Sequence, residues 1–301
     1  MKRTTYIIIG TLAVVLVALC VGLAGWIRLG WGRADTALLL LGKPQTTVLP
    51  ACKAVKIQVP VSWMGEDDAT RKSGTRRFRR INWSPGAITL NNPSDIDTIS
   101  YSHRFGRLNI LPSDSAESVF TCAADMMKYL TTEMRGDTLV ISCDFSDDKL
   151  EPKYRKAYLL NLLTPEWTLR LPAGVELIES VGWDDGGPDV AIDGLQGDTL
   201  ALRGGIFEVS NTRLHALSIS ASTFKIESGE VEHLHVDLDG TWNWNVNTDS
   251  ARINTEYLYG SRDNLSCDLQ KGEACRVVWM PQTEKAALNI TLRQATEVVP
   301  H

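Results

Sequence analysis

The sequence predicts a mainly β protein in which an N-terminal transmembrane helix is followed by a strand-rich portion and then by a parallel β-helix, or β-solenoid. Three observations predict this fold class. Residues 6–27 contain no charged side chain, and about 20 apolar residues span a bilayer as a helix. Much of the chain after residue 51 alternates between apolar and polar side chains, as strands with one buried face do. A short repeat of paired strands, typical of a stacked solenoid, begins near residue 168 and is clearest from residue 200.

The apolar run over 6–27 follows Lys2 and Arg3 and is interpreted first as a signal anchor. On this interpretation the helix makes a single pass through the inner membrane, and the C-terminal domain lies in the periplasm, outside the cytoplasm. Two alternatives stay open: a signal peptide cleaved near residues 22–24, and a lipoprotein signal that ends at Cys20. The apolar run continues past the first site, and Leu19 stands before Cys20 where a small residue is normally required.

The pattern of apolar, polar and charged residues divides the chain into five parts. Residues 1–5 are the expected cytoplasmic tail, 6–27 the anchor, 28–50 a linker, 51–165 a strand-rich N-terminal portion and 166–298 the solenoid repeats. One helix is predicted within the strand-rich portion, over residues 115–134. Its apolar residues recur close to a period of 3.6, and an Asp-Ser pair at 114–115 can cap its start.

The repeat consists of two sets of apolar residues that recur in step along the chain. In the first strand of each coil, the recurring pairs are Leu200 and Leu202, Leu217 and Ile219, and Leu234 and Val236. In the second strand, they are Phe207 and Val209, Phe224 and Ile226, and, after one extra residue, Trp242 and Trp244. Small residues between the two strands permit a tight corner.

A single coil cannot bury its own apolar face, so the coils are expected to stack. We expect Leu200, Leu217 and Leu234 to form one interior column, and Phe207 to lie against Phe224 in another. Each such buried side chain stabilises the fold by about 1.5–3 kcal/mol before entropy is subtracted. An antiparallel sandwich is the alternative, but a register that holds at four positions at once favours the solenoid.

Residues 194–240, GLQGDTLALRGGIFEVSNTRLHALSISASTFKIESGEVEHLHVDLDG, resemble the head domains of auto-transporter adhesins of the GIN type, a β-solenoid family common in Bacteroidota. That family repeats a strand, a Ser-Gly-Ala-Ser-like corner and a second strand, and SISAS at 218–222 is the closest copy of the corner. The resemblance implies a right-handed parallel β-helix on the envelope side of a membrane. It implies no catalytic residue.

The net charge of the chain and the absence of known catalytic motifs reduce the number of possible functions. The net charge of −5 does not favour a nucleic-acid partner. The sequence has no P-loop, no Rossmann fingerprint, no G-x-S-x-G and no H-E-x-x-H motif. We therefore expect a membrane-anchored cell-envelope protein of binding or scaffolding, adhesin-like type, with no catalytic residue and no cofactor. Besides the membrane, the expected partner is an envelope polysaccharide or a protein ligand.

The alternative function is a carbohydrate-active enzyme that uses exterior carboxylates beside Trp side chains, because paired carboxylates suit glycoside hydrolysis. This hypothesis requires a groove that joins at least two members of one acidic set: Asp184, Asp185, Asp189, Asp237 and Asp239. Gly, Pro and Asp are also the usual residues of loops. The acidic residues alone therefore do not favour an enzyme over a solvated loop.

A basic segment is the candidate patch for an anionic partner. Its residues are Arg71, Lys72, Arg76, Arg77, Arg79 and Arg80. The competing interpretation is an exposed hairpin tip whose charges compensate the acidic residues 66–68.

A second polar cluster occupies one expected strand. Its members, which alternate with apolar residues, are His233, His235, Asp237 and Asp239. Successive outward side chains lie about 7 Å apart on a strand, so a shared metal ion would need a ligand from a neighbouring coil. The expected register offers Ala216, Ser218 and Ser220 on one side and Arg252, Asn254 and Glu256 on the other. We therefore expect no metal site here.

Overall fold

The computed structural model describes residues 14–20, 36–40, 42–58, 100–104, 107–143, 159–163, 166–181, 189–292 and 297–300. The chain divides into two compact units, one of residues 1–38, 74–102 and 151–161, and a larger one of residues 39–73, 103–150 and 162–301. A three-stranded sheet has the order β1-β9-β4. Its strands are β1 (Thr36–Leu39), β9 (Leu159–Leu163) and β4 (Ser100–Arg104).

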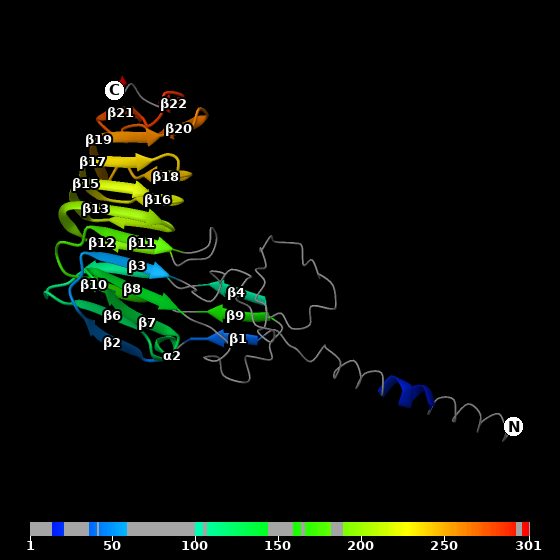
Figure 1. Ribbon diagram of the computed structural model, residues 1–301. Helices are drawn as coiled ribbons and strands as arrows, with labels where there is room; N and C mark the ends of the chain where they lie inside the picture. The colour runs from blue at the N-terminus through cyan, green and yellow to red at the C-terminus, as the bar shows by residue number, and fades with distance from the viewer. Residues whose placement is uncertain are drawn as a thin grey trace, which may run out of the picture. The chain divides into compact units, whose positions relative to one another are not determined.

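A ten-stranded sheet forms one wall of the larger unit, in the order β23-β21-β19-β17-β15-β13-β11-β3-β8-β7. Figure 1 shows its strands stacked one above another. Their bounds are β3 (Ala54–Gln58), β7 (Leu130–Arg135), β8 (Thr138–Cys143), β11 (Leu177–Val181), β13 (Gln196–Gly204), β15 (Thr212–Ser220), β17 (Gly229–Asp237), β19 (Ala251–Gly260), β21 (Arg276–Pro281) and β23 (Glu297–Pro300). The sheet thus includes strands from both the predicted strand-rich portion and the predicted repeats.

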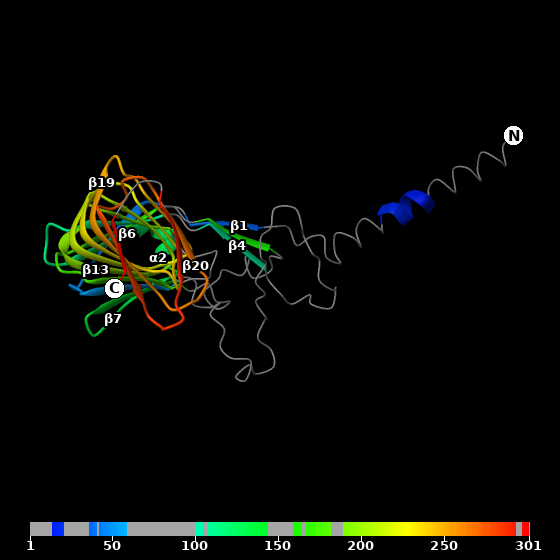
Figure 2. The same ribbon diagram turned by 90° about the horizontal axis from the view of Figure 1, so that it is seen from above.

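An eight-stranded sheet forms a second wall, in the order β18-β16-β14-β12-β5-β10-β6-β2. Seen from above, strands of successive coils overlap one another (Figure 2). The bounds are β2 (Pro44–Leu49), β5 (Leu108–Pro112), β6 (Ser118–Ala123), β10 (Trp167–Leu171), β12 (Val190–Asp193), β14 (Ile206–Ser210), β16 (Thr223–Ile226) and β18 (Asn243–Val246). A parallel pair, β20 (Leu265–Leu269) and β22 (Leu288–Leu292), completes the C-terminal end.

The predicted interior columns are confirmed. Leu200 pairs with Leu217 and Leu217 with Leu234 across the parallel strands β13, β15 and β17, and all three side chains are buried. Phe207 pairs in parallel with Phe224 across β14 and β16, and both are buried. The 17-residue spacing of the sequence is therefore the spacing of stacked coils.

The described elements are mainly β, as predicted, but the predicted arrangement of a transmembrane helix followed by a parallel β-solenoid is wrong. In the described part of the chain, no helix is long and apolar enough to cross a membrane. Of the predicted anchor, the structure describes only residues 14–20, which are helical. The N-terminal transmembrane helix and the single-pass placement in the inner membrane are therefore not supported.

The sheets are also mixed, whereas a solenoid would have purely parallel ones. Strand β6 runs antiparallel to both β2 and β10, and β7 runs antiparallel to β8. The physical reason is clearest for β7 and β8, since only Gly136 and Asp137 connect them. A connection of two residues can join only antiparallel strands, and Gly136 adopts a φ of +61° that suits a tight turn.

The helix predicted over 115–134 is wrong. The structure has strand β6, a four-residue helix α2 (Ala124–Met127) and strand β7 in its place. Within β6, Phe120 and Cys122 are buried while Val119 and Thr121 are partly exposed, which is the alternation of a strand. Helical periodicity is a weak preference that tertiary pairing overrides, and β2 and β10 supply that pairing.

The predicted recurrence of Trp242 and Trp244 is also shifted. Phe224 pairs with Trp244 and Ile226 with Val246, while Trp242 is 78% exposed. Thr223 pairs with Asn243, which lies 20 positions further along the chain. The reason is an extra turn over residues 237–241, in which the Gly240 and Thr241 amides donate hydrogen bonds to the Asp237 carbonyl. The corner is three residues longer than in the preceding coil.

Candidate functional site: an outward groove on the ten-stranded sheet

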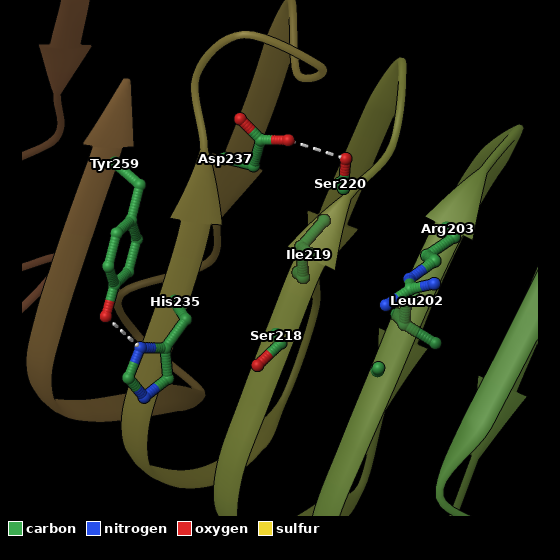
Figure 3. Close-up of a pocket in the computed structure, with 9 residues that line it drawn as sticks. Leu202, Arg203, Ser218, Ile219, Ser220, His235, Asp237 and Tyr259 are labelled. Atoms are coloured by element: carbon green, nitrogen blue, oxygen red, sulfur yellow. Dashed lines mark hydrogen bonds between the residues drawn. The ribbon is translucent and has the colours of Figure 1, made fainter. Parts of the chain in front are cut away.

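An open groove of about 300 Å³ crosses strands β13, β15, β17 and β19 of the ten-stranded sheet (Figure 3). Its lining residues are Ala201, Leu202, Arg203, Ser218, Ile219, Ser220, His235, Asp237 and Tyr259. Leu202 and Ile219 are buried members of the interior columns. Because strands alternate their side chains, the polar lining residues that neighbour them face outward. The same periodicity that builds the core therefore builds the groove.

One side of the groove is a row of aromatic rings. The His235 ring stacks on the Tyr257 ring, with centroids 4.7 Å apart and planes 7° apart, and lies 5.7 Å from the Tyr259 ring. A hydrogen bond of 2.9 Å joins His235 Nδ1 to the Tyr259 hydroxyl. Burial lowers the pKa of His235, and the nearby His233 lowers it further. This imidazole is therefore neutral at neutral pH, and it holds the Tyr259 hydroxyl at the groove.

Beside the aromatic row, on the same strand as His235 and paired with Tyr259, lies the carboxylate of Asp237 (Figure 3). Ser220 Oγ donates a hydrogen bond of 2.8 Å to Asp237 Oδ2, and the Asp239 amide donates one of 3.0 Å to Asp237 Oδ1. Gly240 makes room for this arrangement, since a Cβ at that position would lie 2.6 Å from Ser220 Oγ and 3.1 Å from Asp237 Oδ2. The carboxylate is therefore held in one orientation before any ligand arrives.

Arg203 supplies the positive charge of the groove. Its side chain is exposed, and no described carboxylate forms an ion pair with it. A guanidinium offers five N–H donors in a planar fork. Arg203 can therefore bind hydroxyl or carboxylate oxygens of a ligand.

The structure does not bring the sequence-predicted acidic residues together. Asp184 and Asp185 lie outside the described residues. Asp189 is exposed and does not line the groove, and its carbonyl accepts a hydrogen bond from the Leu108 amide. Asp239 bonds to Arg262 Nε at 3.0 Å and to the Ser261 amide at 2.8 Å. Of the three members of the set that the structure describes, Asp237 is the one that lines the groove.

The predicted basic patch, residues 71–80, lies outside the described residues. The outward His-Asp row has the expected neighbours on one side, where Ala216 pairs with His233 and Ser218 with His235. On the other side the predicted register is wrong: His233 pairs with Thr255 and His235 with Tyr257. The offset between β17 and β19 is three positions longer than expected, and an odd shift reverses the two faces of a strand.

Sequence reasoning missed a buried acidic cluster created by this shift. Glu256 points inward and is 0% exposed, and neither of its carboxyl oxygens has a hydrogen-bond partner among the described residues. Burial raises its pKa well above the ordinary range, and the nearby Glu273 adds to the effect. Glu273 is also buried, and it accepts 2.7 Å hydrogen bonds from Trp244 Nε1 and the Gln270 amide. Only the register of β19 could have revealed Glu256.

The comparisons with known proteins give structural neighbours of low identity. A structure described as a "putative adhesin" from Bacteroides fragilis is 9% identical, with a TM-score of 0.44, covering 87% of this chain and 99% of its own. A "putative lipid binding protein" from Parabacteroides distasonis is 11% identical, with a TM-score of 0.38, covering 88% and 100%. A "putative adhesin" from Parabacteroides merdae is 10% identical, with a TM-score of 0.32 and the same coverage.

No protein-family model and no curated protein matches the chain. Structures described as "putative adhesin" from Bacteroidales are thus among the similar ones, which is consistent with the adhesin-like family that residues 194–240 resemble. The GIN type itself stays a prediction. With TM-scores below 0.5, these neighbours do not decide what the chain binds.

Proposed function

We propose that this chain is a non-catalytic binding protein of adhesin-like type, and that its outward groove binds a glycan. The observation that carries the proposal is the combination of the aromatic row, the fixed Asp237 carboxylate and the exposed Arg203 in one groove. Aromatic rings pack against the C–H faces of sugars, and charged groups form strong hydrogen bonds to their hydroxyls. The groove is at the small end of the range for ligand pockets, about 300–1,000 Å³, which suits a single sugar residue of a chain.

The single carboxylate favours binding over the alternative, a carbohydrate-active enzyme. Glycoside hydrolysis requires two carboxyl groups separated by about 5–9.5 Å across the scissile bond. Among the described lining residues, Asp237 alone carries a carboxylate, and both of its oxygens already accept hydrogen bonds. These bonds fix the carboxylate, whose remaining acceptor sites can bind sugar hydroxyls, and the described lining residues include no second carboxyl group to complete a catalytic pair.

The test is a glycan array probed with the full chain, followed by calorimetric titration of the glycans that bind. Arg203→Ala and Tyr259→Ala should each weaken binding by about tenfold or more, which corresponds to about 1.4 kcal/mol or more. Arg252→Ala is the matched control, because Arg252 is exposed on β19 and does not line the groove. Equal affinities in all three variants, or the absence of any bound glycan, would overturn the proposal. Cleavage of a bound glycan would favour the enzyme.

A further inference from the structure

Three side chains that can coordinate a metal ion converge on the outer face of the ten-stranded sheet. They are separate from the residues that line the groove. They are His215 of β15, and Glu232 and His233 of β17. One ligand atom from each lies within 4.8 Å of the other two. No residue of this cluster lines the groove.

The convergence follows from a break in the strand alternation. In β15, Leu214 and Leu217 are both buried, and the two residues between them, His215 and Ala216, are more exposed. Strand β17 repeats the pattern, with Glu232 and His233 between the buried Val231 and Leu234. Two consecutive side chains therefore turn away from the core in each strand. The parallel register, in which Leu214 pairs with Val231 and Ala216 with His233, brings His215 beside Glu232.

The distances are close to those of a coordinated ion. His215 Nδ1 lies 2.6 Å from Glu232 Oε2, and His233 Nε2 lies 4.0 Å from Glu232 Oε1. Ligands bound tetrahedrally at about 2.0–2.1 Å from zinc are about 3.3 Å apart. To share one ion, His215 would move away from Glu232, and the Glu232 carboxylate would turn toward His233. The His215 and Glu232 side chains are both more than half exposed, so they can rotate in this way.

The surroundings of His233 decide which of its two nitrogens faces the cluster. Its Nδ1 atom is buried and has no hydrogen-bond partner among the described residues. The ring is held between its neighbours, with the His215 centroid at 5.0 Å and the Tyr257 centroid at 5.8 Å. In this position His233 Nε2 lies on the side of the Glu232 carboxylate, 4.0 Å from Oε1, where Nε2 can coordinate an ion.

We propose that His215, Glu232 and His233 bind a divalent transition-metal ion, zinc by preference. Two imidazoles and one carboxylate form the ligand set of zinc sites that keep a fourth position open, and imidazole suits zinc better than magnesium or calcium. The His215 and Glu232 side chains are 51% and 53% exposed, so water fills the fourth position. This proposal is independent of glycan binding in the groove.

The test is calorimetric titration of the untagged, chelator-treated full chain with zinc chloride. We expect saturable binding of one ion per chain, which Glu232→Gln and His215→Ala each weaken by more than about tenfold. Glu230→Gln is the matched control, because Glu230 is an exposed carboxylate on the same strand that pairs with Arg213 at 3.2 Å. This control should bind zinc as the wild type does.

A thermal melt supplies the second measurement. Zinc should raise the Tm of the wild type and of Glu230→Gln, and should leave that of Glu232→Gln unchanged, because an ion that binds only the folded state stabilises it. Absence of saturable zinc binding, or equal affinity in Glu232→Gln and Glu230→Gln, would overturn the proposal. The glycan affinity of Glu232→Gln should match that of the wild type. The proposal of a metal site and the proposal of glycan binding in the groove can therefore fail independently.

Discussion

Glu256 stands opposite Leu234 in the parallel register of β17 and β19, so a carboxyl side chain continues the interior column that Leu200, Leu217 and Leu234 begin. The next member of the column is Val277. A polar group at such a position costs free energy unless it is hydrogen-bonded. Glu256 has no such partner among the described residues, and the C-terminal coils are therefore less stable than an all-apolar column would make them.

Replacing this carboxyl with an apolar side chain should stabilise the protein. Glu256→Leu is expected to raise the free energy of unfolding by about 1–3 kcal/mol at pH 7, because it removes a buried unsatisfied group. Urea denaturation followed by circular dichroism measures the change. Glu230→Leu, at an exposed position of the neighbouring strand, should change stability by less than about 1 kcal/mol. A destabilised Glu256→Leu would show that the carboxyl has a partner or a role in the folded state.

The raised pKa of Glu256 also predicts a dependence of stability on pH. The unfolded chain releases this proton near the ordinary value of 4.5, whereas the folded chain keeps it to a higher pH. Above pH 4.5 the folded state binds more protons than the unfolded state, so the free energy of unfolding falls as the pH rises toward the folded-state pKa. Burial raises the pKa of Glu273 as well, which adds a contribution of the same sign.

Glu256→Gln should remove one of these two contributions. In urea denaturation at pH 5, 6, 7 and 8, the stability of the variant relative to the wild type should increase with pH. A difference that stays constant over this range would mean that Glu256 ionises equally in both states.

The orientation of Asp237 depends on the small size of Gly240. In Gly240→Ala, the added Cβ would lie 2.6 Å from Ser220 Oγ, so the hydrogen bond from Ser220 to Asp237 must break or shift. We expect a loss of about 1 kcal/mol in stability and a weaker affinity for the glycan. Gly197→Ala is the control, since a Cβ there would have no atom within 4 Å. Equal glycan affinity in Gly240→Ala and Gly197→Ala would show that the hydrogen bond between Ser220 and Asp237 does not contribute to glycan binding.

Adjacent residues of β15 should differ widely in their tolerance of charge. Ile219 is buried in an interior column, whereas Ser218 is exposed. Ile219→Asp is expected to destabilise the protein by more than about 4 kcal/mol, or to prevent folding, because it buries an unpaired charge. Ser218→Asp should change stability by less than about 1 kcal/mol. The two variants are compared by denaturant unfolding, or by soluble yield if a variant does not fold. Similar losses of stability at Ile219 and Ser218 would contradict the register of β15.

Some of the candidate site was readable from the sequence. The alternation of residues 233–239 correctly predicts that His235 and Asp237 face outward, and both line the groove. The expected register also places Ser220 beside this row, and its hydroxyl donates a hydrogen bond to Asp237. Tyr259 and Arg203 were not predicted, since they come from two other strands. The proposed metal ligands include one residue that alternation does not place outward: a strict alternation puts Glu232 inward, whereas in the structure Glu232 and His233 both turn away from the core between Val231 and Leu234.

The sequence by itself determined the local strands and the 17-residue spacing that stacks Leu200, Leu217 and Leu234. Both follow from short-range chemistry, because side-chain direction alternates along a strand and strands β13, β15 and β17 recur at the same spacing of 17 residues. The tertiary structure alone decided the antiparallel pairs, the shift from Trp242 to Trp244 and the inward turn of Glu256. Register between strands depends on the length of each corner, and because side chains alternate with a period of two, an odd change in that length exchanges the buried face for the exposed one.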